Sequence, residues 1–199
     1  MKAHLKMSLL GLTLAAIPGA AFAHTGIGDP GGLAHGFAHP IGGVDHVLAM
    51  VAVGMFAAAL GGRALWLVPS TFVLVMAAGG ALGIAGIGVP FVEFGIAASV
   101  IVLGLAVALQ VSVPVIAAMA IVGFFAVFHG HAHGAEMPAD ASGFNYALGF
   151  MLATALLHVA GIGIGLGIGR MGAGKSRIAL RAGGGIMAFA GAGILAGYF

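Results

Sequence analysis

Two groups of histidine and acidic residues carry the side chains of this sequence that could do chemistry. The first comprises His39, Asp45 and His46, where a polar, glycine-rich segment meets a long apolar one. Ionisable groups at membrane depth are costly, so they usually face the protein interior and mark a functional site. His46 shares a helix face with Met50, four residues on. We interpret this group as ligands of a divalent transition metal ion.

Asp45 has two interpretations at this point. It could orient an imidazole or bind the ion itself, or it could cap the helix while the histidines lie among lipid headgroups. His39 precedes Pro40, which favours an extended backbone at the residue before it. We therefore expect His39 to fold back over the start of the helix.

The second group is a histidine tract at the end of a later apolar segment. His129, His131, His133 and Glu136 offer imidazole and carboxylate ligands, which suit nickel, cobalt, zinc or copper. We expect a flexible cluster of ligands in the connection near 129–143, in which His129 faces the pathway, while His131 and His133 capture ions outside. A histidine-rich tract is a compositional signal, and a solvated loop is the alternative.

Two ionisable residues lie inside apolar segments, Glu93 and His158. Met151, Thr154 and His158 follow helical spacing and share a face. Each of the two ionisable groups could be satisfied by a neighbouring polar group. Together with the first two groups, they distribute ionisable residues over four helices, which favours a path lined by the bundle.

The composition places these groups in a membrane protein. Of the 199 residues, 61% are hydrophobic and 6% are charged, whereas soluble domains carry about 25% charged residues. No basic patch suggests nucleic acid as a partner, and the absence of cysteine excludes thiolate ligands. Since a spanning helix needs about 20 mostly apolar residues, we predict an all-α bundle of six transmembrane helices, at 41–60, 64–85, 90–109, 113–128, 144–168 and 179–198.

Residues 1–23 have the pattern of a cleaved signal peptide, with a basic start, an apolar stretch and small residues before the cleavage site. An uncleaved first helix is the alternative. Cleavage leaves a transmembrane domain of residues 24–199, in which the amine and imidazole of His24 could chelate a metal ion together. Turn-forming residues at 24–40 predict an irregular segment outside the membrane.

The basic residues predict the orientation, because lysine and arginine concentrate in cytoplasmic loops. Arg63 follows the first predicted span, and four basic residues surround the gap between the fifth and sixth. Both termini of the mature chain are then periplasmic. Glycines at four-residue spacing, such as Gly79 and Gly83 or Gly161 and Gly165, predict close helix packing in lipid.

The order and spacing of three motifs resemble the HupE/UreJ family across essentially the whole mature chain. The motifs are His39-Pro40-x-x-Gly43-x-Asp45-His46, Phe128-His129-Gly130-x-Ala132-His133-Gly134-x-Glu136, and Gly149-Phe150-x-x-Ala153-Thr154-x-x-x-His158. The resemblance implies a permease of the bacterial inner membrane for nickel or cobalt, linked to the supply of hydrogenase or urease. It carries functional roles to six of these residues, namely His39, Asp45, His46, His129, His133 and Glu136. His131 occupies a variable position of the pattern.

These observations suggest a route for the ion and no tightly bound cofactor. Outer residues would collect a hydrated ion (His24, His35, His131, His133 and Glu136). It would pass to His39, Asp45, His46 and His129, and then inward by way of Glu93 or His158. No nucleotide-binding motif is present, so transport would run downhill or couple to an ion gradient. The alternatives are a metal sensor or chaperone, an intramembrane metalloenzyme lacking the His-Glu-x-x-His motif, and a haem protein. The oligomeric state is not predicted.

Overall fold

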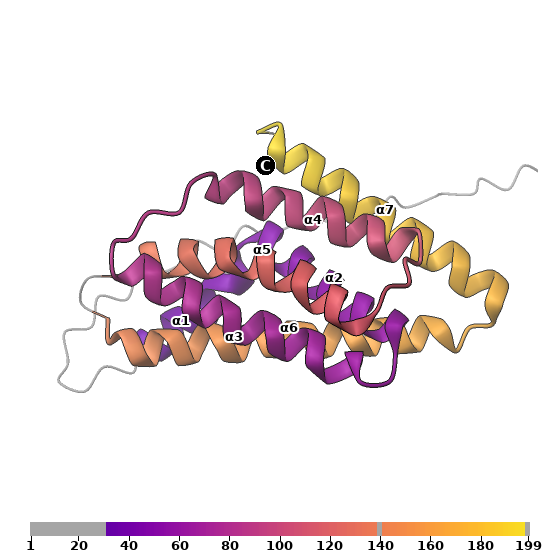
Figure 1. Ribbon diagram of the computed structural model, residues 1–199, viewed down its shortest axis with the longest axis horizontal. Helices are drawn as coiled ribbons and strands as arrows, with labels where there is room; N and C mark the ends of the chain where they lie inside the picture. The colour runs from indigo at the N-terminus through magenta and orange to yellow at the C-terminus, as the bar shows by residue number, and fades with distance from the viewer. Residues whose placement is uncertain (1–30, 139–140, 198–199) are drawn as a thin grey trace, which may run out of the picture.

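The computed structural model describes residues 31–138 and 141–197, which form helices joined by short turns, with no strand among them (Figure 1). The helices are α1 (Gly31–Gly42), α2 (Val44–Leu60), α3 (Ala64–Ile84), α4 (Val92–Ala108), α5 (Val115–Ala135), α6 (Gly143–Gly169) and α7 (Ala173–Leu195). The predicted signal peptide and His24 lie outside the described residues.

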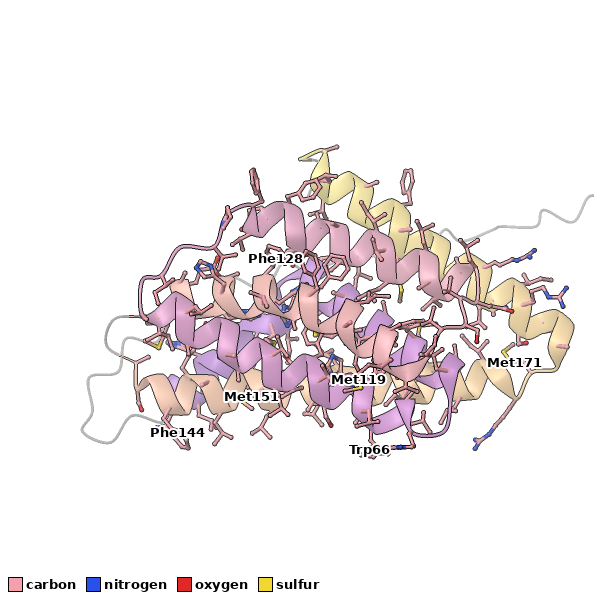
Figure 2. The ribbon with its side chains drawn as sticks, viewed as in Figure 1. Trp66, Met119, Phe128, Phe144, Met151 and Met171 are labelled. Carbon is pink, nitrogen blue, oxygen red and sulfur yellow. The ribbon has the colours of Figure 1, made fainter. Side chains whose placement is uncertain are left out.

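Each predicted span corresponds to one helix of a multi-pass membrane protein. Four described helices, α3, α5, α6 and α7, are long and apolar enough to cross a membrane, or up to five if the bent pair of α1 and α2 counts as one span. Helix α4 is apolar but shorter, with 17 residues. The six-span count therefore stays a prediction. Large apolar side chains cover the outside of the bundle, and Trp66 and Phe144 point away from it (Figure 2).

The segment before the first span is helical in its described part, so the prediction of an irregular backbone there was wrong for residues 31–40. Helix α1 includes Pro40 and meets α2 at Gly43 with a bend of 82°. It packs along α6, with Gly36 against the backbone of Tyr146 and Gly149 against the backbone of Leu33. This packing outweighs the local effect of Pro40, and His39 is helical rather than extended.

The histidine tract is also helical, so the prediction that it lies in a flexible connection beyond the span was wrong. Helix α5 continues to Ala135, seven residues beyond the predicted end at 128. Gly130 and Gly134 lie on the face that meets α3, against the backbone of Met76 and Gly80. Because small residues let helices approach closely in lipid, the contact with α3 keeps the tract helical.

The basic residues of the described chain gather toward one end of the bundle. Helix α7 begins at Ala173, earlier than the predicted 179, and includes Lys175, Arg177 and Arg181. The α2–α3 turn, with Arg63, and the α6–α7 turn lie at the same end of the bundle (right in Figure 1). Nitrogen-tipped side chains project there near Met171 (Figure 2). The ends of α3 and α5 and the starts of α4 and α6 lie toward the other end (Figure 1).

Glycine sets the spacing of the main helix pairs, α3 with α5, α2 with α6, and α4 with α7. Gly54 of α2 faces Gly161 of α6, and Gly104 of α4 faces Gly184 of α7. Gly79 and Gly83 lie against the α5 backbone as their spacing predicts. In contrast, a Cβ added at Gly163, Gly167 or Gly169 of α6 would meet nothing within 4 Å, so only part of the glycine run of α6 serves packing.

Replacing Gly130 by alanine should destabilise the bundle. Its Cβ would collide with the carbonyl of Met76, a backbone atom that cannot move aside alone. Forcing extra atoms into a packed contact costs about 1–3 kcal/mol, so we expect the detergent-solubilised Gly130→Ala protein to melt at a lower temperature. Gly163→Ala is the matched control, because its Cβ would enter open space. Equal melting temperatures for the two variants would show that the α3–α5 contact is not tight.

Candidate metal centre

A cavity of about 660 Å³ opens among the helices where α5 ends and α4 begins. Its lining combines four histidines of the two sequence groups with every acidic residue of the described part of the chain. The lining residues central to the site are His35, His39, Asp45, His46, Glu93, His129, His133, Glu136 and Tyr146. The fold thus brings together residues from α1, α2, α4, α5 and α6.

The outer part of the cavity holds a group with metal-ligand geometry. His39 Nε2 lies 2.8 Å from Glu136 Oε2, and the His39 ring stands edge-on to the His133 ring at 5.0 Å. One ligand atom from each of His39, His133 and Glu136 lies within 4.8 Å of the other two. His39 and Glu136 are exposed, whereas His133 is buried. These three residues form the outer group, which joins the two sequence motifs at the water-facing end of the cavity.

Behind the outer group, three imidazoles make a buried chain of contacts. His133 Nε2 lies 3.0 Å from His46 Nδ1, which in turn lies 3.0 Å from His129 Nδ1. The exposed fractions of these residues fall from 6% for His133 to 4% for His46 and 1% for His129. We call these three residues the histidine file. It leads from the outer group into the protein interior.

The spacing of the tract along α5 explains the histidine file. His129 and His133 are four residues apart and share one face of a helix, as do Gly130 and Gly134, which lie one residue farther on. Because the glycines meet α3, the two histidines point toward α2, where His46 lies. His131 is on another face, and its Nε2 lies 2.9 Å from the carbonyl oxygen of Ile87.

Ser99 of α4 fixes the hydrogen position on His129. The Ser99 hydroxyl donates to the carbonyl oxygen of Ile96 at 2.6 Å, and its oxygen lies 2.8 Å from His129 Nε2. A hydroxyl has one hydrogen to donate, so Nε2–H of His129 must donate to Ser99. His129 Nδ1 then carries a lone pair. At 3.0 Å from it, His46 Nδ1 must supply the hydrogen, and His133 Nε2 must also be an acceptor.

The histidine file therefore holds one hydrogen between two lone pairs. His129 Nδ1 and His133 Nε2 both present lone pairs toward His46 Nδ1, and neutral imidazole nitrogen is a ligand of divalent transition metals. The other nitrogen of His46, Nε2, lies 3.4 Å from Thr154 Oγ1. Thr154 in turn donates to Met76 Sδ at 3.7 Å.

Asp45 bonds to the backbone in the first turn of α2 and also lines the cavity. Its Oδ1 accepts a hydrogen bond from the backbone N–H of His46 at 2.7 Å, which suits an acidic residue in the first turn of a helix. The carboxylate also lines the cavity beside the histidine file. The residue that caps α2, Gly43, has no side chain that would crowd this carboxylate.

The remaining predicted residues divide between the cavity and other places. Glu93 lies in the first turn of α4, and its exposed side chain lines the cavity. It therefore lies at the outer end of the proposed route and not on the inner part predicted for it. His35 is exposed and lines the cavity. His131 is not among the cavity residues. His158 is buried deep in α6 and is likewise not among them.

Ser99, Phe72 and Met76 contribute to the site, and sequence reasoning missed all three. Ser99 is the hydroxyl of an otherwise apolar stretch of α4, which is a signal because polar groups in membrane helices usually face the bundle. Phe72 packs against His129 at 5.6 Å. Nothing in its type or spacing separates it from the other apolar residues of α3.

Comparison with known proteins gives matches over nearly the whole chain. The model of the HupE / UreJ protein family matches residues 12–194. The chain belongs to the HupE/UreJ family. It is 50% identical to "Protein HupE" of Rhizobium leguminosarum bv. viciae over 196 residues, which cover 97% of this chain and all of the relative. No solved structure matches the chain. In this member of the HupE/UreJ family, residues from all three motifs lie at or beside the cavity.

Removing the Ser99 hydroxyl should weaken metal binding at the histidine file. Without Ser99, His129 Nε2 loses its acceptor and the ring can turn or change tautomer. Loss of a partner that orients a ligand typically costs 10–100-fold in metal affinity, so we expect nickel affinity to fall by about that factor in Ser99→Ala. Equilibrium dialysis of purified full-length protein measures it.

Ser99→Thr is the control, because threonine keeps a hydroxyl that can donate to a carbonyl of the preceding turn. We expect Ser99→Thr to restore most of the affinity. If Ser99→Ala binds nickel as wild type does, Ser99 does not orient the file.

Proposed function

We propose that this HupE/UreJ-family protein carries a divalent transition metal ion, nickel or cobalt, inward across the bacterial inner membrane. The observation that supports this most strongly is the continuous series of ligand atoms from the exposed Glu136 and His39, through His133, to the buried His46 and His129. A protein that only bound an ion would not need ligands at graded depth. Zinc and copper share these ligands.

The chemistry of the series suits a permeating ion. A conducting path must bind its ion strongly enough to admit it and weakly enough to release it. Carboxylates at the mouth attract the hydrated cation, and neutral imidazoles then replace its water. Each contact in the file, at 3.0 Å, is short enough for an ion to pass from one ring nitrogen to the next.

The charge distribution supports an inward direction. The basic turns, with Arg63 at one and Arg170 at the other, lie at the end of the bundle away from the start of α6 (Figure 1). By the preference of basic loops for the cytoplasm, the cavity opens to the periplasm. Both termini of the mature chain are then periplasmic. The path would supply metal to a cytoplasmic hydrogenase or urease.

Removing the charge of Asp45 or the ring of His46 should abolish metal uptake. Asp45→Asn keeps an oxygen that can accept from the His46 backbone N–H, so it tests the negative charge rather than the helix start. His46→Ala removes the middle of the file. We expect uptake of radioactive nickel to fall at least about tenfold in both variants, in cells without other nickel importers, while membranes hold normal amounts of protein.

A pair from the same helix tests the assignment of faces. We expect His133→Ala to lose uptake and His131→Ala to keep most of it, because His131 Nε2 contacts the Ile87 carbonyl and not the file.

Wild-type uptake in the Asp45 and His46 variants would refute the proposed function. Nickel binding by purified protein without flux into proteoliposomes would favour a sensor or chaperone instead.

A further inference from the structure

His158 is a buried imidazole that the outer group and the histidine file do not use. It is 1% exposed, and within the described part of the chain neither Nδ1 nor Nε2 has a hydrogen-bond partner. A neutral imidazole offers one donor and one acceptor, and each buried group left unpaired costs about 1–3 kcal/mol. An apolar residue at this position would avoid that cost, so the ring serves something other than packing.

The position of His158 continues the line of the histidine file. It lies 15 residues after the first residue of α6, which at 1.5 Å per residue is about 22 Å along the helix. Thr154, one turn earlier on the same face, lies 3.4 Å from His46 Nε2 and donates to Met76 Sδ. Thr154 therefore lies between the file, which it contacts, and His158, which is one turn farther along α6.

One aromatic ring contacts both the file and His158. Phe72 is fully buried, and its ring centre lies 5.6 Å from that of His129 and 5.3 Å from that of His158. The Phe72 ring meets His158 edge-on, at an interplanar angle of 86°. An apolar ring in this place blocks a charged ion, because it offers no ligand in exchange for water.

The backbone around His158 is packed closely against α2, whereas the Phe72 side chain is not part of this backbone contact. A Cβ on Gly54 of α2 would collide with the carbonyl oxygen of His158, and Gly161 lies against Val51 and Gly54 in the same way. Because α2 and α6 are in backbone contact here, the His158 main chain is held in place. With the main chain held, rotation of the Phe72 side chain would open the way.

We propose that His158 is an inner site of the metal path, which receives the ion from His46 and His129 when the Phe72 ring turns aside. This inference rests on the proposed function and extends it past the histidine file. The imidazole of His158, with the Thr154 hydroxyl and the Met76 thioether nearby, makes a set of borderline and soft donors. Such donors accept nickel, cobalt or copper and discriminate against magnesium and calcium, which require several oxygen ligands.

Flux and binding measured separately test the inner site. In proteoliposomes containing full-length protein, we expect His158→Leu to reduce nickel flux at least about tenfold, while equilibrium dialysis finds nickel bound at the outer group and file with wild-type affinity. Val159→Leu, the next residue on the exposed side of α6, should match wild type in both measurements. Wild-type flux in His158→Leu, or loss of binding together with flux, would overturn the inner site. Absence of nickel flux in the wild-type protein would instead refute the proposed function.

The natural absence of cysteine allows a second test that does not depend on flux. His158→Cys introduces a single thiol, which reacts with a charged methanethiosulfonate reagent only where water ionises it. We expect slow labelling of His158→Cys, at least about tenfold faster labelling when Phe72→Ala is added, and slower labelling in the presence of nickel. Val159→Cys is the control and should stay unreactive with or without Phe72→Ala. No acceleration by Phe72→Ala would overturn the role of the ring as a barrier.

Discussion

The close contact between α3 and α5 determines how the rest of the site is built. Gly130 and Gly134 let α5 lie against the backbone of Met76 and Gly80, and this fixes the rotation of α5 about its axis. With that rotation fixed, His129 and His133 face α2 and His131 faces away. A bulkier face on α5 would move the helix outward and separate its histidines from His46. In the tract, the glycines therefore set the orientation of the histidines beside them.

The sequence predicted most of the helices and most of the polar residues that line the candidate site, because both depend on strong local signals. Six apolar stretches stand out by length, and the three motifs stand out by residue type. It did not predict that residues 129–135 are helical, since glycines and histidines at this density are typical of loops and only the partner helix makes them a packing face. It also missed the 82° bend of the chain at Gly43, which depends on how α1 packs on α6. Ser99 acts through two hydrogen bonds that exist only in the folded bundle.

The acidic and imidazole groups are distributed by depth, and this follows from the cost of burying charge. Asp45, Glu93 and Glu136, the acidic residues of the described chain, all line the cavity near water. Beyond them the ligand groups are imidazoles, which can be neutral. An ionised carboxylate deep in the bundle would need a permanent partner, and it would hold a divalent cation too firmly to release it.

The hydrogen between the rings of the file bears on how a cation would enter it. On the proposed function, an ion that binds between His46 and either His129 or His133 needs a lone pair on His46 Nδ1, the nitrogen that carries the hydrogen in the arrangement set by Ser99. Neutral imidazole can carry that hydrogen on Nε2 instead. There it faces Thr154 Oγ1 at 3.4 Å, whose own hydrogen points to Met76 Sδ and leaves the oxygen free to accept. His46 can therefore exchange a hydrogen bond for a metal bond by a change of tautomer. The ion then enters the file without releasing a proton into the apolar interior. Thr154 stabilises the new tautomer because its oxygen can accept the hydrogen of His46 Nε2.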